Sequence, residues 1–119
     1  MTRVTNSTRG AVLAGAADTA RSPWAQFVGL MGRAELPDGT GLVFHGTRGV
    51  HTHFMRFPID VIFFDRDRVV VGVEHALRPW RFSAYYLRAK GALELPAGTA
   101  HATATEPGDV LSITEAAAA

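Results

Sequence analysis

The feature that most constrains the fold is an apolar run near the centre of the chain, residues 59–64, with the sequence Ile-Asp-Val-Ile-Phe-Phe. Every position except Asp60 is hydrophobic, so a strand here would bury both of its faces, as a central strand of a sheet does. The charged residues 65–68 are typical of a turn, and the apolar residues 69–73 can pair back as a second buried strand. The run therefore predicts a sheet with a buried, paired centre.

The rest of the chain adds shorter strands and one helix. Alternating or apolar patterns favour strands at residues 2–4, 10–14, 41–44, 50–54, 92–95 and 110–113. Ser22 before Pro23 is typical of a helix N-terminus. Apolar residues then follow at helical spacing up to Gly32: Trp24, Phe27, Val28 and Met31. With a helical turn expected at 99–103, the pattern predicts an α+β, mainly β domain: a curled mixed sheet or small barrel with one principal helix.

Length and composition narrow the class of protein. The 119 residues suit one compact domain, which we place at 1–119, with a core at about 20–113 and a frayed tail at 114–119. The chain has no cysteine, which excludes disulfides and cysteine-ligated metal centres. Twelve Lys+Arg against eleven Asp+Glu give a net charge of +1, so nucleic acid is not expected as a partner. The polar residues 1–8 and the lack of a long apolar run predict a cytoplasmic protein with no membrane partner.

A first group of candidate site residues lies just before the central strand. His51 and His53 alternate, so on a strand both side chains would project from one face, with Asp60 just beyond the bend at Pro58. The three could hold a metal or an anion, or His51 and Asp60 could act as general acid and base. The structural alternative is that one histidine bonds the backbone and that Asp60 pairs with Arg56 to fix the bend. We expect no metal site, because this ligand set is incomplete.

A second candidate segment lies between Glu74 and Glu94. It contains no acidic residue, but basic and aromatic residues interleave over 78–90. Trp80 and Arg81 could hold an anionic ligand by stacking and by paired hydrogen bonds. The segment could instead cover the edge of the core, with its arginine stems along apolar surface. A third interpretation is that the loop from Trp80 to Tyr86 docks another protein.

Several motifs occur together in an order typical of one family: Gly29-Leu30-Met31-Gly32-Arg33, Leu36-Pro37, Gly41-Leu42-Val43-Phe44, the run from His51 to Asp65, Leu93-Glu94-Leu95-Pro96-Ala97-Gly98-Thr99 and Gly108-Asp109. On these motifs the chain resembles the prokaryotic family of the domain of unknown function 192. The resemblance implies a small, mainly β α+β domain and brings no established catalytic residue or cofactor.

The resemblance also marks individual positions. The family's characteristic residues fall on His51, Phe54, Met55, Pro58, Asp60, Glu94, Pro96 and Gly98. His53 departs from the aromatic residue common at its position, which favours His51 with Asp60 over a shared His-x-His metal site. The short N-terminus also departs from exported relatives, which carry a signal or lipoprotein segment.

Three functions are compatible with these residues. The favoured one is a non-catalytic module that binds a small anionic or polar ligand near His51, Arg56, Asp60, Trp80 and Arg81, without a cofactor. The alternatives are a hydrolase-like enzyme with a His51–Asp60 pair and a protein-interaction module that uses the Trp80 to Tyr86 loop. A deep pocket that holds both His51 and Asp60 would favour the first two. An exposed aromatic patch around Trp80 and Tyr85 would favour the third.

Overall fold

A computed structural model describes residues 2–20 and 30–115. Its elements in chain order are β1 (Thr2–Asn6), β2 (Ala11–Ala20), β3 (Thr40–His45), β4 (Ile59–Phe64), β5 (Val70–Leu77), β6 (Gly91–Pro96), α2 (Thr99–Ala102) and β7 (Leu111–Glu115). The predicted helical turn near 99 is confirmed as α2. Most of the predicted principal helix lies outside the described residues. These positions of the predicted helix are Ser22, Pro23, Trp24, Phe27 and Val28. Residues 30–32 at its end form a turn.

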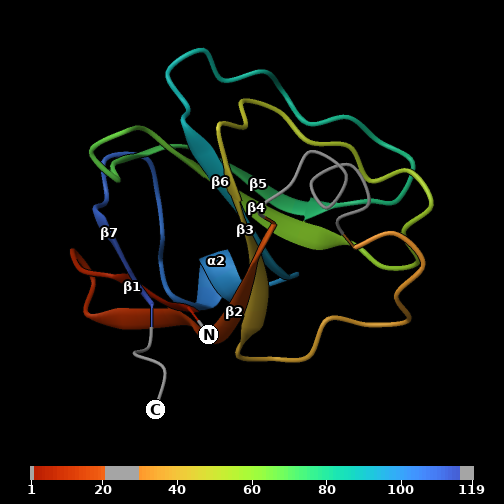
Figure 1. Cartoon of the computed structure of the whole chain (residues 1–119), viewed down its shortest axis with the longest axis horizontal. Helices are drawn as coiled ribbons and strands as arrows, with labels where there is room; N and C mark the ends of the chain where they lie inside the picture. The colour runs from red at the N-terminus through yellow and green to blue at the C-terminus, as the bar shows by residue number, and fades with distance from the viewer. Residues whose placement is uncertain (1, 21–29, 116–119) are drawn as a thin grey trace.

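The described strands form one seven-stranded mixed sheet in the order β5-β4-β6-β3-β2-β1-β7. β2 and β3 run parallel, and the other neighbouring pairs are antiparallel. The sheet curls until a single bridge between Val69 and Val110 brings the start of β5 next to β7, so that it forms a half-barrel around α2 (Figure 1). This confirms the predicted fold class, a mainly β α+β domain with a curled mixed sheet.

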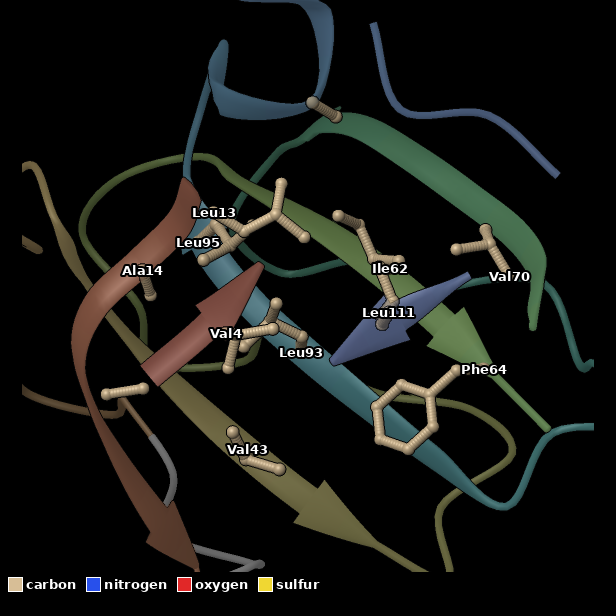
Figure 2. Close-up of a cluster of buried hydrophobic side chains, with 12 residues drawn as sticks. Val4, Leu13, Ala14, Val43, Ile62, Phe64, Val70, Leu93, Leu95 and Leu111 are labelled. Carbon is tan, nitrogen blue, oxygen red and sulfur yellow. The ribbon is translucent and has the colours of Figure 1, made fainter. Parts of the chain in front are cut away.

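Strand β4 is buried over its whole length, as its apolar sequence predicts. Its residues alternate between two apolar clusters, one on each face of the sheet. Ile62 and Phe64 join the inner cluster, inside the curl, where they meet side chains from β1, β3, β6 and β7 (Figure 2). Val61 and Phe63 join the outer cluster with Met55 and other residues of the connecting segments. The sheet therefore separates two cores.

One predicted strand, residues 50–54, is wrong. His51 makes only a single antiparallel bridge, with Phe82, and Phe54 lies in the left-handed region with φ 65°. On a strand, Thr52 and Phe54 would share the face opposite to that of His51 and His53, yet Thr52 is buried and Phe54 is 62% exposed. The physical cause is Thr52, whose amide and hydroxyl both bond the main chain at Arg81. The segment follows a loop instead of joining the sheet.

This loop and a second loop, which follows β5, both pack on the outer face of the sheet. We call residues 46–57 and 78–90 the loop pair; both segments leave the same side of the sheet in Figure 1. Tyr86 fixes the second segment: its ring stacks on Phe63, with centroids 4.5 Å apart, and its hydroxyl donates to Glu74. The ring lies directly over Gly72, where an added Cβ would come within 2.0 Å of it. Glycine at this position lets the loop pair pack closely on β5.

Candidate functional site

Asp60 is a buried carboxyl group whose two oxygens accept backbone hydrogen bonds. It is 0% exposed and lies on β4. Its Oδ1 accepts a hydrogen bond from the amide of Ala76 at 2.8 Å, and its Oδ2 accepts from the amides of Gly98 at 3.0 Å and Ala100 at 2.8 Å. The side chain thus joins β4 to β5 and to the start of α2.

The other predicted site residues lie elsewhere. Arg56, Trp80 and Arg81 are exposed on the loop pair, and within the described residues no ion pair joins Arg56 to Asp60. His51 lines an open groove on the loop pair, and Asp60 is not among the residues that line it. The structure therefore brings His51, Arg56, Trp80 and Arg81 onto one pair of segments and leaves Asp60 inside the sheet.

The two histidines do lie side by side. Their ring centroids are 5.3 Å apart, and the Nδ1 atom of His51 accepts a hydrogen bond from the amide of His53 at 3.2 Å. An accepting Nδ1 places the proton of neutral His51 on Nε2. In the described ranges 2–20 and 30–115, no group of three or more His, Cys, Asp or Glu side chains is arranged to hold a metal ion.

Four rings on the loop pair form a continuous exposed surface, which we call the aromatic ridge: His53, Phe54, Trp80 and Phe82. His53 packs against Trp80 and Phe82, with centroid distances of 5.4 Å and 4.8 Å, and Phe54 packs against Trp80 at 4.7 Å. Phe54, Trp80 and Phe82 are nonetheless 62%, 53% and 76% exposed. The rings support one another while most of their surface faces solvent.

Buried hydrogen bonds hold the ridge in place from below. Thr52 is 0% exposed; its carbonyl accepts from the amide of Trp80 at 2.9 Å, and its amide donates to the carbonyl of Arg81 at 2.8 Å. Its hydroxyl accepts from the amide of Arg81 and donates to the carbonyl of Arg78. One threonine therefore links both segments of the loop pair.

The loop pair is also strongly basic. It carries six of the chain's twelve Lys and Arg residues and none of the eleven Asp and Glu residues, although the chain as a whole is nearly neutral. Glu74, on β5, contacts the loop pair through the amide of Ala84 and the hydroxyl of Tyr86. The surface around the ridge thus combines aromatic rings with positive charge.

Glu94 is a second buried carboxyl group, and sequence reasoning did not single it out as a site. It lies on β6 opposite Leu42 of β3 and Val61 of β4, and it is 3% exposed. Its Oε1 has no hydrogen-bond partner within the described residues. Burial raises the pKa of Glu94 to about 8, so the side chain is protonated at neutral pH.

Glu94 should make the protein less stable as pH rises. Its usual pKa is 4.5, so between pH 4.5 and 8 the unfolded chain loses this proton while the folded chain keeps it. The free energy of unfolding then falls with pH, by roughly 1.4 kcal/mol per unit, and levels off above pH 8. Glu94→Gln should flatten this decline in urea titrations across the window, whereas Glu35→Gln, at an exposed position, should retain it. Equal slopes in the parent and Glu94→Gln would contradict the assignment.

The half-barrel sheet, with α2 in its curl and a basic, aromatic loop pair on its outer face, defines a small mainly β domain of the α+β class. A family model matches residues 4–113, and the chain belongs to that family: the domain of unknown function DUF192, described as an uncharacterized ACR. No helix within 2–20 or 30–115 has the length and apolar content to cross a bilayer.

Proteins from three organisms are similar to this chain. A UPF0127 protein of Thermococcus sibiricus is 36% identical over 112 residues, which cover 87% of this chain and 70% of that protein. One from Pyrococcus furiosus is 44% identical over 62 residues, 52% of this chain and 53% of the other. The crystal structure of a protein of unknown function from Novosphingobium aromaticivorans matches this fold with a TM-score of 0.80 and 27% sequence identity. The match covers 93% of this chain and 82% of the Novosphingobium chain.

Proposed function

We propose that this protein is a non-catalytic binding module that docks a partner protein through the aromatic ridge. The observation that carries the proposal is the exposure of Phe54, Trp80 and Phe82 as one packed cluster. Adjoining exposed apolar side chains mark interaction sites, whereas scattered ones do not. Asp60 has no part in this site, because it is fully buried and already accepts three backbone hydrogen bonds.

The backbone beneath the ridge supports the same conclusion. Phe54 and Trp80 have φ values of 65° and 63°, in the left-handed region that large side chains rarely adopt. Each such residue costs about 1–2 kcal/mol, and strain of this kind concentrates at functional positions. Both strained residues direct their rings toward solvent, so packing in the core does not compensate this cost.

Charge and ring geometry together favour one class of partner. The loop pair has basic side chains and no acidic ones, so the complementary surface carries carboxylates. Tryptophan and arginine are also the side chains most enriched in the energetic centres of protein interfaces. His53 packs edge-on against Trp80, and the Phe54 ring is tilted by 58° against it, so the rings contact one another and are not separate parallel platforms for stacking successive bases. We therefore assign a protein segment with a large apolar residue beside Asp or Glu.

Peptide selection tests this assignment directly. A library of short random peptides is first depleted of peptides that bind the Trp80→Gly variant. The remaining peptides are then selected for binding to the parent protein. The expected winners carry a large apolar residue next to acidic residues. Their affinities for the parent and for the variants can be read from the fluorescence anisotropy of dye-labelled peptides, because this signal does not require Trp80. We expect Trp80→Gly to weaken them at least about tenfold, as loss of a central aromatic does.

Trp80→Gly is chosen because the fold should tolerate it. Glycine adopts a positive φ freely, so the relieved strain offsets the lost ring packing, and the free energy of unfolding should change by less than about 1 kcal/mol. Leu87→Ala is the matched control: Leu87 is 76% exposed but lies outside the ridge, so selected peptides should bind this variant normally.

Four results would overturn the proposal. The first is that every peptide that binds the parent also binds Trp80→Gly, so that none is left after depletion, and the second is that the selected peptides are basic. The third is salt-dependent binding of oligothymidine at Trp80, which would assign nucleic acid as the partner. The fourth is a concentration-dependent dimer that sedimentation detects in the parent but not in Trp80→Gly, which would assign a second copy of this chain.

A further inference from the structure

Beside the ridge, the loop pair forms a groove that the proposed docking does not use. Its volume is about 560 Å³, within the range of small-molecule sites, and it is open to solvent. Residues 46–51 line one side and residues 82–85 the other. The lining includes no acidic residue, and Phe82 alone belongs also to the ridge.

The groove carries hydrogen-bond donors that the described protein leaves unused. The amides of Thr47, Arg48 and Gly49 form no hydrogen bond in residues 2–20 and 30–115, although the flanking amides of Gly46 and Val50 are bonded to the second segment. The Arg48 guanidinium likewise has no ion pair or hydrogen bond in the same residues. Consecutive unbonded amides beside a cation are the usual features of an anion-binding loop.

The opposite wall carries two aromatic rings. Tyr85 is 65% exposed and lines the groove next to Phe82, and its ring lies close to the backbone of Gly49. A Cβ added to Gly49 would lie 3.7 Å from the Tyr85 ring and 3.6 Å from Ser83 Oγ, so the loop and this wall are close together there. The exposed part of the Tyr85 ring remains open to the groove, and a flat organic group can lie against it while its charged end reaches Arg48.

We infer that this groove is a binding site for a small anion, a carboxylate or phosphate group attached to a flat organic body. Arg48 and the amides of Thr47 and Gly49 take the anionic group, and Tyr85 takes the body. The site lies apart from Asp60, and its ligand differs in kind from the partner of the ridge. It stands on the unbonded donors and the groove, so it does not depend on docking at Trp80.

Chemical-shift titrations of the full chain test the site with simple probes: benzoate, phenyl phosphate, inorganic phosphate and the neutral analogue benzamide. Benzoate and phenyl phosphate should shift the amide signals of Thr47, Arg48 and Gly49, whereas benzamide should not. Arg48→Gln should weaken both anions about tenfold, as expected for a charge-assisted hydrogen bond. Arg66→Gln, in the exposed turn between β4 and β5, is the matched control and should bind like the parent.

Two more variants separate the parts of the site. Tyr85→Ala should weaken benzoate and leave inorganic phosphate unchanged, because only the flat body is lost. Trp80→Gly should bind benzoate like the parent, which distinguishes this site from the ridge. The inference is overturned if no probe shifts these amides at its highest soluble concentration, if benzamide binds as well as benzoate, or if Arg48→Gln binds both anions like the parent.

Discussion

Ile62→Asp is expected to prevent this chain from folding. Ile62 is 0% exposed on β4, between Val73 of β5 and Leu93 of β6, and it lies in the inner cluster. The substitution removes a buried apolar side chain and places an unpaired carboxyl group where no water reaches it. Such a change costs several kcal/mol, a large part of the roughly 5–15 kcal/mol by which a domain of this size is stable.

Thermal unfolding followed by circular dichroism measures the effect. The parent should show a cooperative transition, and Ile62→Asp should show none. Val12→Asp makes the same kind of change on β2, where the side chain is 46% exposed, and it should melt close to the parent. If Ile62→Asp melted within a few degrees of the parent, β4 would not be buried on its inner face.

Asp60→Ala should be the second most damaging substitution. It would leave three amides, those of Ala76, Gly98 and Ala100, without their acceptor. The buried amide of Ala100 would cost about 1–3 kcal/mol without a partner, and the part-buried amides of Ala76 and Gly98 add less each, so the summed loss is on the order of 3 kcal/mol. Asp60→Asn retains one acceptor oxygen, and its stability should fall between those of the parent and Asp60→Ala.

Urea unfolding gives this ranking, and hydrogen exchange locates its cause. The amides of Gly98 and Ala100 should lose protection in Asp60→Ala before the rest of the sheet does. Asp38→Ala, at an exposed position, should resemble the parent. If Asp60→Ala unfolded at the urea concentration of the parent, the three hydrogen bonds would have no net role in stability.

The sequence predicted those features that depend on local periodicity. The apolar run at β4 predicted a strand buried on both faces, and the structure has one. Sequence reasoning also recognised that a carboxyl group at Asp60 needs partners, but it suggested Arg56. The true donors are backbone amides from 16 to 40 residues away. Backbone partners leave no residue-type signal, so only the folded chain reveals them.

The two segments of the candidate site were predicted from the sequence, but their contact was not. The segments around His51 and Trp80 were each recognised from their residue types, but nothing in the sequence showed that they pair with each other. Their contact depends on main-chain hydrogen bonds through Thr52, a residue that draws no attention by itself. Arg48 was missed because it lies in a short glycine-containing loop with no aromatic neighbour in sequence.

The position of β1 has a consequence for how this chain can fold during synthesis. β1 is hydrogen-bonded on one side to β2 and on the other to β7, where Thr2 is paired with Glu115. Among the described strands, β1 leaves the ribosome before the others and β7 after them, so the β1–β2 hairpin has one unpaired edge until β7 has emerged. Pairings so distant in sequence form slowly. Unpaired edges attract other chains, so aggregation is the hazard of slow or interrupted translation of this protein.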